Sequence, residues 1–218
     1  MSLDDTAPGT SGTAAPATPP ELRNVSDART LRALAHPVRI AILEALSLGG
    51  AMTATEVGEQ IGESPTTCSF HLRQLARYGF VEEAGGGKGR ARPWRMVSVG
   101  VDISNTRGDP ETEIAATALG QLIRERQLDR YRAWEETKAS YPRRWRDAAS
   151  DSQLMFHVTA EELAQLNDEL RAFLRPRFLE RLNDPALRPP GAVPVEMVVS
   201  SYPLTLPPAD GDDREETS

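Results

Sequence analysis

Residues 64–99 read SPTTCSFHLRQLARYGFVEEAGGGKGRARPWRMVSV. Ser64, followed by a proline, is typical of a helix start, and Gly79 marks the end of that helix. Two short stretches that favour strands, 80–83 and 93–99, flank a basic loop with the sequence GGGKGR. This loop is too long for a two-residue hairpin turn. The stretch therefore predicts a helix followed by a β-hairpin with a mobile basic tip, a wing.

Three further helices are predicted before residue 64, at 26–36, 37–49 and 53–62. Their apolar residues recur at helical spacing, and the segments are separated by His-Pro and by glycines. Thr53 with Glu56 has the spacing of a capping box at the start of the third helix. The four helices and the hairpin together predict a winged helix-turn-helix, with the helix after residue 64 as its second, exposed helix.

The remainder of the chain predicts one long helix and a small mixed domain. Asp109-Pro110 opens the long helix and Tyr141-Pro142 ends it, after which we expect a strand at 153–158, a helix from Thr159 and a strand at 195–202. The predicted fold class is α+β, with an α/β C-terminal domain. The predicted segments are a disordered arm (1–25), the winged helix-turn-helix domain (26–100), the long helix (109–140), the C-terminal domain (141–206) and an acidic disordered tail (207–218).

The formal net charge of −7 is unevenly distributed along the chain. Residues 27–100 hold nine Lys/Arg and seven Asp/Glu, which gives +2, whereas residues 101–218 hold fifteen and twenty-two, which gives −7. Four basic residues lie between 88 and 95. Because local charge decides contact with phosphates, the predicted wing can bind nucleic acid although the whole chain is acidic.

Composition argues against several classes of protein. No run of about 18 apolar residues could span a membrane, so we expect no membrane partner. Residues 1–23 lack the basic and apolar regions of a signal peptide. The single Cys68 cannot form an internal disulfide, which agrees with a cytoplasmic protein.

The predicted helix after Ser64 has two different faces. Cys68, Leu72 and Leu75 fall on one face at helical spacing, where Val57 and Ile61 are natural packing partners. The opposite face begins with small hydroxyl groups, which can bond to base edges, and ends with arginines, which can reach phosphates. Its residues are Thr66, Ser69, Phe70, Arg73 and Arg77. This order of side chains indicates double-stranded DNA as the partner.

Several motifs within residues 27–99 agree at once: ALAHPVRIAIL, S-x-x-T-x-S-x-H-L-x-x-L from Ser64 to Leu75, GFVEE and GRxRPWR. Together they resemble the winged helix-turn-helix of the arsenic-repressor-type (ArsR) transcriptional regulators. The resemblance implies a dimeric, operator-binding repressor that releases DNA when a ligand or metal binds. Phe70 stands where a polar residue is common, so we expect contact with a thymine methyl there. The DNA-binding residues expected from the resemblance, the helix face and the basic wing are Ser64, Thr66, Thr67, Ser69, Phe70, Arg73, Arg77, Lys88, Arg90 and Arg92.

The sequence departs from the metal-sensing members of that family. The helix at 53–62 has no Cys or His, the long helix has no His, and three histidines with one cysteine are too few for a transition-metal site. Redox sensing by paired thiols within one subunit needs a second cysteine. Cys68 is interpreted as core filler, and His36, His71 and His157 as structural residues. We expect no metal and no cofactor.

Catalysis is not expected either. A Walker-type loop needs Ser or Thr after its lysine and a helix beyond it, whereas Lys88 precedes Gly89 and a strand. Ser64 and His71 do not form a triad, because Ser64 serves as a helix cap and nothing orients the histidine. The chain is therefore not interpreted as an enzyme.

Two surfaces remain as candidates in the C-terminal half. An apolar strip on the long helix is a candidate homodimer seam, with packing inside one subunit as the alternative; its residues are Ala115, Ala118, Leu119, Leu122 and Ile123. An aromatic group is a candidate pocket for a small apolar effector, with an ordinary core as the alternative; its residues are Tyr131, Trp134, Trp145, Phe156 and Met197. The function expected is a ligand-responsive repressor that acts as a homodimer on an inverted-repeat operator. The alternative is a protein-interaction adaptor whose winged domain binds DNA weakly or not at all.

Overall fold

A computed structural model describes residues 22–85, 92–98, 100–102, 109–174, 181 and 185–206. The predicted arm before residue 22, the wing tip with Lys88 and Arg90, and the acidic tail at 207–218 lie outside the described residues. The molecule combines helices with two small sheets, as the α+β fold class predicts.

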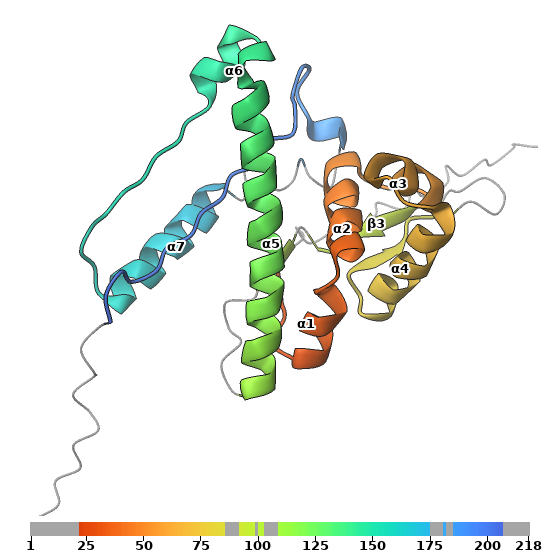
Figure 1. The fold of residues 1–218 in the computed structure, drawn as a ribbon, viewed down its shortest axis with the longest axis horizontal. Helices are drawn as coiled ribbons and strands as arrows, with labels where there is room; N and C mark the ends of the chain where they lie inside the picture. The colour runs from red at the N-terminus through yellow and green to blue at the C-terminus, as the bar shows by residue number, and fades with distance from the viewer. Residues whose placement is uncertain are drawn as a thin grey trace, which may run out of the picture.

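The N-terminal domain consists of four helices and a hairpin (Figure 1). The four helices begin and end where local capping chemistry predicts, within one or two residues. Strands β2 and β3 are antiparallel, with Glu82 opposite Arg95. A further bridge joins Met52 to Trp94 and thereby ties the hairpin to the loop after the second helix. The elements are α1 (Ala28–Leu34), α2 (Pro37–Gly49), α3 (Ala54–Ile61), α4 (Pro65–Arg77), β2 (Val81–Glu83) and β3 (Trp94–Met96).

The caps of these helices explain their bounds. Thr53 and Glu56 form the predicted capping box, with the Glu56 carboxylate accepting from the Thr53 backbone N–H at 2.7 Å. Gly62 ends α3 at φ +74°, a left-handed conformation that favours glycine. The helix predicted from residue 26 begins two residues later: Asp27 caps α1, because its carboxylate lies 2.8 Å from the Thr30 backbone N–H.

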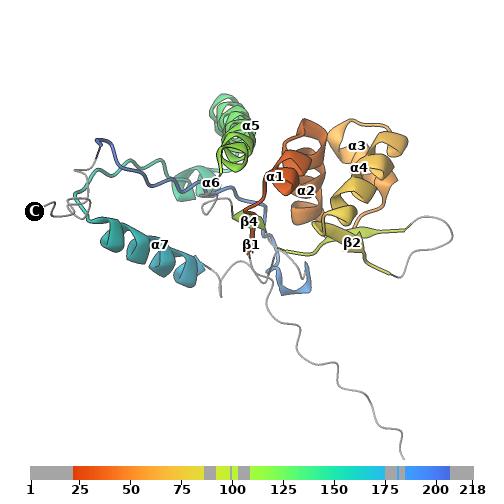
Figure 2. The same cartoon turned by 90° about the horizontal axis from the view of Figure 1, so that it is seen from below.

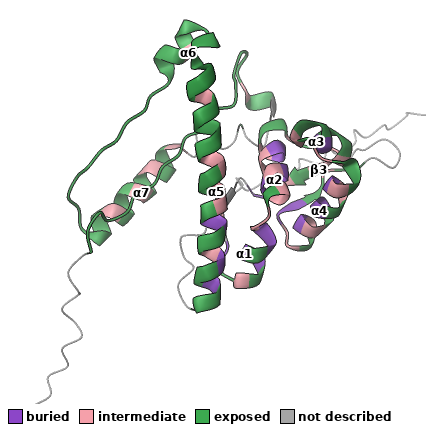
Figure 3. Ribbon diagram, viewed as in Figure 1, coloured by how far each residue is buried: buried purple, intermediate pink, exposed green. Residues whose placement is uncertain are grey.

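The core lies between α1, α2, α3, α4 and the hairpin. Its largest fully buried side chains come from every one of these elements, and the first half of the next helix closes it from the side. They include Leu31, Ile42, Leu46, Val57, Leu72, Leu75, Phe80, Val81 and Leu119. In Figure 3 the buried residues gather in this domain and in the first half of the helix that follows it.

A second sheet was not predicted from the sequence. Strand β1 (Leu22–Asn24) pairs in parallel with β4 (Gly100–Asp102), so residues 22–24 belong to the fold and the predicted disordered arm extends too far. This pairing joins segments 78 residues apart, Leu22 with Gly100, and no local sequence signal announces it. The sheet lies between the winged domain and the C-terminal half (Figure 2).

Helix α5 (Pro110–Thr137) runs along the domain and projects beyond it (Figure 1). Its first half packs on α1, and its second half is joined to α2 by ion pairs. Glu44 accepts from Arg126 at 2.5 Å and from Arg130 at 2.8 Å, while Arg130 also donates to Glu196 at 3.1 Å. Burial acts to raise the pKa of Glu44, but the two guanidinium groups outweigh it and hold that pKa below its ordinary value.

The C-terminal half contains helices but no strand among its described residues. A 3₁₀ turn (Lys138–Ser140) and α6 (Arg143–Ala148) follow α5, and α7 (Ala160–Leu174) begins at the predicted capping box of Thr159 and Glu162. The strands predicted at 153–158 and 195–202 are wrong for this chain alone, because neither segment forms a backbone ladder with another described segment. A strand needs a paired neighbour as well as β-prone residues.

Candidate nucleic-acid interface

Helices α3 and α4 form the helix-turn-helix pair. Val57 and Cys68 are fully buried between them, which confirms the interpretation of Cys68 as core filler. Burial, aided by the nearby Glu63 carboxylate, raises the pKa of the Cys68 thiol and keeps it unreactive. Gly58 determines how closely the helices approach: a Cβ there would lie 2.6 Å from the Glu63 carbonyl oxygen and 3.6 Å from the Cys68 sulfur.

The outward face of α4 carries the residues predicted to contact DNA. Thr66, Phe70, Arg73 and Arg77 are exposed, and Phe70 retains 52% of its accessible surface. Ser69 is half-buried, and its hydroxyl accepts from the Arg73 guanidinium at 2.9 Å. The structure thus brings small hydroxyl groups, one aromatic ring and two arginines onto one face of a helix.

Two predicted contact residues are engaged in the helix cap. The Ser64 hydroxyl accepts from the Thr67 backbone N–H at 3.0 Å, and the two hydroxyl groups lie 2.8 Å apart. A hydroxyl group retains a second bonding site after such a contact. Ser64 and Thr67 therefore fix the start of α4, and the hydroxyl groups of Thr66 and Ser69 are the stronger candidates for base contact.

The arginines of the hairpin are held by acidic residues of the facing strand. Arg92 pairs with Glu83 at 2.7 Å, and Arg95 pairs with Glu82 at 2.7 Å. All four side chains are largely exposed, so these pairs contribute little to stability. A phosphate group can therefore replace either carboxylate as a partner at small cost.

Two histidines connect α4 to α2. His36 caps α2, where its Nδ1 accepts from the Val38 N–H at 3.2 Å, and its ring lies 4.6 Å from the ring of buried His71. Burial lowers the pKa of both histidines, and the nearby Arg39 lowers them further. His36 thus caps a helix and His71 is a buried residue of α4, whose Nδ1 has no hydrogen-bond partner among the described residues.

Arg23 was not singled out in the sequence. Its guanidinium donates to the Tyr78 carbonyl at the end of α4 and lies 4.5 Å from the centre of the Phe80 ring. A cation at a helix C-terminus is stabilising, and stacking on an aromatic ring adds to it. Arg23 therefore joins β1 to the end of the helix that carries the candidate contacts, and only its three-dimensional position reveals this role.

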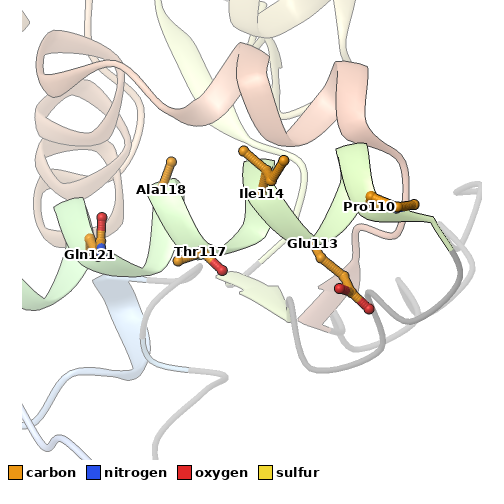
Figure 4. Close-up of a pocket in the computed structure, with 6 residues that line it drawn as sticks. All are labelled: Pro110, Glu113, Ile114, Thr117, Ala118 and Gln121. Carbon is orange, nitrogen blue, oxygen red and sulfur yellow. The ribbon is translucent and has the colours of Figure 1, made fainter.

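The apolar strip predicted as a homodimer seam is mostly covered by other elements of the same chain. Ala115 and Leu119 are buried in the core of the winged domain, and Leu122 and Ile123 pack against that core from α5. Only Ala118 faces outward. The free side of α5 instead forms a shallow groove of about 450 Å³ over its first turns (Figure 4). The groove is lined by Pro110, Glu113, Ile114, Thr117, Ala118 and Gln121.

The predicted effector residues are exposed or half-buried, and none of them lines the groove on α5. Phe156 is exposed by 52% and Met197 by 68%, and the ring contact of Trp134 is with Tyr141, at 4.9 Å. Tyr131 is 44% exposed and donates to Asp151 at 2.7 Å. Trp145, also predicted to line the pocket, is half-buried on α6.

Two further features concern the described residues as a set. No group of three His, Cys, Asp or Glu side chains in the described ranges is arranged to hold a metal ion. Within the same ranges, every helix is too short or too polar to cross a bilayer.

Comparison with known proteins identifies a domain in the first half of the chain. Residues 34–84 match a family model described as a helix-turn-helix domain. No curated protein matches the chain significantly. Similar solved structures include a mutant of ZitR from Lactococcus lactis in its apo form, with 13% sequence identity and a TM-score of 0.24, covering 68% of this chain and 81% of that chain. A likeness of that size carries no weight for function. The chain carries a helix-turn-helix domain, and DNA binding is the activity that this domain supports.

Proposed function

We propose that this chain, which carries a helix-turn-helix domain, is a transcriptional regulator that binds an inverted-repeat operator as a homodimer. The outward face of α4 is the observation that carries the proposal. Thr66 and Ser69 offer hydroxyl groups near its N-terminus, and Arg73 and Arg77 offer charge further along. This arrangement suits a helix whose first turns meet base edges while its later turns lie near phosphates.

The residues take distinct roles in the proposed complex. Thr66 and Ser69 bond to base edges, and exposed Phe70 contacts a thymine methyl. Arg73 is already held by the Ser69 hydroxyl, so its guanidinium is oriented before DNA arrives. The hairpin arginines exchange their carboxylate partners for phosphates.

A homodimer is proposed because one recognition helix contacts only a short stretch of DNA. A single recognition helix buries little DNA surface, so tight specific binding needs two copies about 34 Å apart, one helical turn of DNA. The groove on the free side of α5 is the proposed seam, because its wall combines Ile114, which is 71% exposed, with small Ala118. Repression that a small apolar ligand relieves is the mode implied by the resemblance to ArsR-type regulators, and the aromatic residues of the C-terminal half remain the proposed effector region.

A gel-shift experiment tests the DNA-binding proposal. DNA from beside the protein's own gene should bind in preference to a scrambled duplex, and Arg73→Ala with Arg77→Ala should abolish the complex. Arg132→Ala is the matched control, since this exposed arginine lies on α5 and pairs with Asp129. Equal, weak binding to both duplexes would overturn the proposal and favour the protein-interaction adaptor.

A further inference from the structure

The described residues of the C-terminal half form no buried core of their own. From Gln121 to Leu206 no described residue is buried, as the exposed colouring of α6 and α7 shows in Figure 3. Fifteen large apolar side chains between Leu154 and Leu206 are nevertheless exposed, by 43% to 95%. Monomeric proteins rarely leave so many apolar side chains open to water.

The exposed area is large enough for a stable interface. At about 60 Å² of removable apolar surface for each half-exposed side chain, the fifteen together offer about 900 Å². A standard interface takes about 800 Å² from each partner. The C-terminal half can therefore supply one side of a protein–protein interface without any contribution from α5.

Residues 195–202 have the features of a strand without a partner. This segment is bounded by Pro194 and Pro203, which cannot donate to a ladder, and among the described residues it forms no backbone–backbone hydrogen bond. Figure 1 shows it as an extended segment that crosses beside α7 and α5. Side-chain bonds anchor it there: Glu196 accepts from Arg130 at 3.1 Å, and Ser201 Oγ lies 3.0 Å from Asn167 Oδ1. The segment is thus held in place, and its backbone has no backbone partner among the described residues.

The side chains of this segment favour an apolar neighbour. In an extended chain alternate residues share a face, so Val195, Met197 and Val199 lie together, and they are 74%, 68% and 52% exposed. Glu196 is the single charged residue between 195 and 202, and Arg130 neutralises it. Natural proteins protect exposed strand edges with lysines, prolines or bulges. Here such protection is confined to the two bounding prolines.

We infer that residues 195–202 pair in antiparallel fashion with the same segment of a second copy of this chain. The inference rests on the proposed homodimer and assigns part of its interface. An antiparallel pair of identical strands needs only a two-fold axis, the symmetry that an inverted-repeat operator also requires. If the two-fold axis passes through residue 197, 198 or 199, then Val195, Met197 and Val199 of both copies lie on the same face of the two-stranded sheet. Glu196 then never lies opposite its own copy, so no like charges meet.

Cysteine substitution tests this pairing directly. Only the residue on the two-fold axis faces its own copy, where Cβ atoms lie about 4.5–5.5 Å apart, close to disulfide distance. Among Met197→Cys, Val198→Cys and Val199→Cys, one variant should give a covalent dimer on mild oxidation at micromolar concentration. The native Cys68 is fully buried, so the unchanged protein serves as the blank. Glu59→Cys, at an exposed position of α3 outside this interface, measures chance collision.

Two proline variants measure the backbone contribution. Only alternate N–H groups of an antiparallel strand face its partner, so either Val198→Pro or Val199→Pro removes a ladder donor; both positions are about half exposed, and the winged domain should keep its melting temperature. In at least one of the two variants the dimer dissociation constant, measured by sedimentation, should rise at least tenfold. An unchanged constant in both would overturn the inference.

The outcomes separate this inference from the proposed function. Three cysteine variants that give no more covalent dimer than Glu59→Cys would overturn the strand pairing. If Ala118→Cys alone cross-links, the homodimer stands through α5 and the strand pairing is wrong. A chain that is monomeric at every concentration overturns both the strand pairing and the homodimer, whereas its gel shift still decides DNA binding.

Discussion

Gly58→Ala tests how the helix-turn-helix is built. Alanine inside a helix is favoured over glycine by about 1 kcal/mol, so helix propensity alone predicts a more stable protein. The structure predicts the opposite sign. The new Cβ would lie 2.6 Å from the Glu63 carbonyl oxygen, about 0.8 Å inside the 3.4 Å at which ordinary contact begins. That oxygen belongs to the backbone of the turn into α4, so it cannot move as a flexible side chain can.

The size of the effect follows from these two opposing terms. Overpacking of a core costs about 1–3 kcal/mol, and contact with a backbone atom places this site near the upper end. After the gain in propensity, about 1–2 kcal/mol of destabilisation remains. For a domain of this size that lowers the melting temperature by about 5–15 °C. Because α4 must shift against α3, specific DNA affinity should also fall by about tenfold, the worth of one good base contact.

Circular dichroism melts and fluorescence anisotropy at 25 °C measure the two effects. Gly62→Ala is the matched control, since a Cβ there meets nothing within 4 Å and only the left-handed backbone, at φ +74°, opposes it. That control should lose stability but retain DNA affinity. A Gly58→Ala protein that is as stable as the parent, or that binds its operator equally well, would refute the reasoning.

Three further predictions concern the wing, pH and the groove face. Replacing Arg90 and Arg92 with Ala should weaken binding to all sequences alike and lower the salt slope by about 0.9 for each phosphate that the wing no longer binds, as titration in increasing salt measures; an unchanged slope would remove the wing from the mechanism. Folding lowers the pKa values of His36 and His71. In the unfolded chain these histidines have a pKa of about 6.5, so below that pH the unfolded chain binds more protons than the folded protein does. Stability present above that pH should therefore decline as the pH falls towards 5, and melts that are flat across this range would contradict it. Thr66→Ala should cost about 1–3 kcal/mol of discrimination with little change on random DNA, whereas equal losses on both would mean phosphate contact only.

The bounds of the helices could be predicted because helix caps are local. Thr53 with Glu56, Gly62 and Asp109 each act within a few residues, and each lies where the sequence places it. The parallel pairing of Leu22–Asn24 with Gly100–Asp102 could not be predicted in this way, because neither segment shows a local signal for the other.

The outward faces were harder to predict than the helices that carry them. Helical periodicity identified the apolar side of α5, but it does not say whether the same chain or a second copy covers that side. Here the same chain covers Ala115 and Leu119. On α4, the pattern gave the exposed face, whereas the cap bonds that engage Ser64 and Thr67 became visible only with atomic positions. Strand propensity at 195–202 likewise cannot show where a partner strand comes from.

The acidic partners of the hairpin arginines bear on how fast the proposed regulator would find an operator. Glu82 and Glu83 neutralise Arg95 and Arg92 while the protein is away from DNA, and they place negative charge beside any phosphate that the arginines approach. Binding at random sequences, which depends on charge alone, should therefore be weakened more than binding at the operator, where base contacts compensate. We expect short dwell times on genomic DNA and rapid transfer between sites, so that few copies are sequestered during the search for the operator.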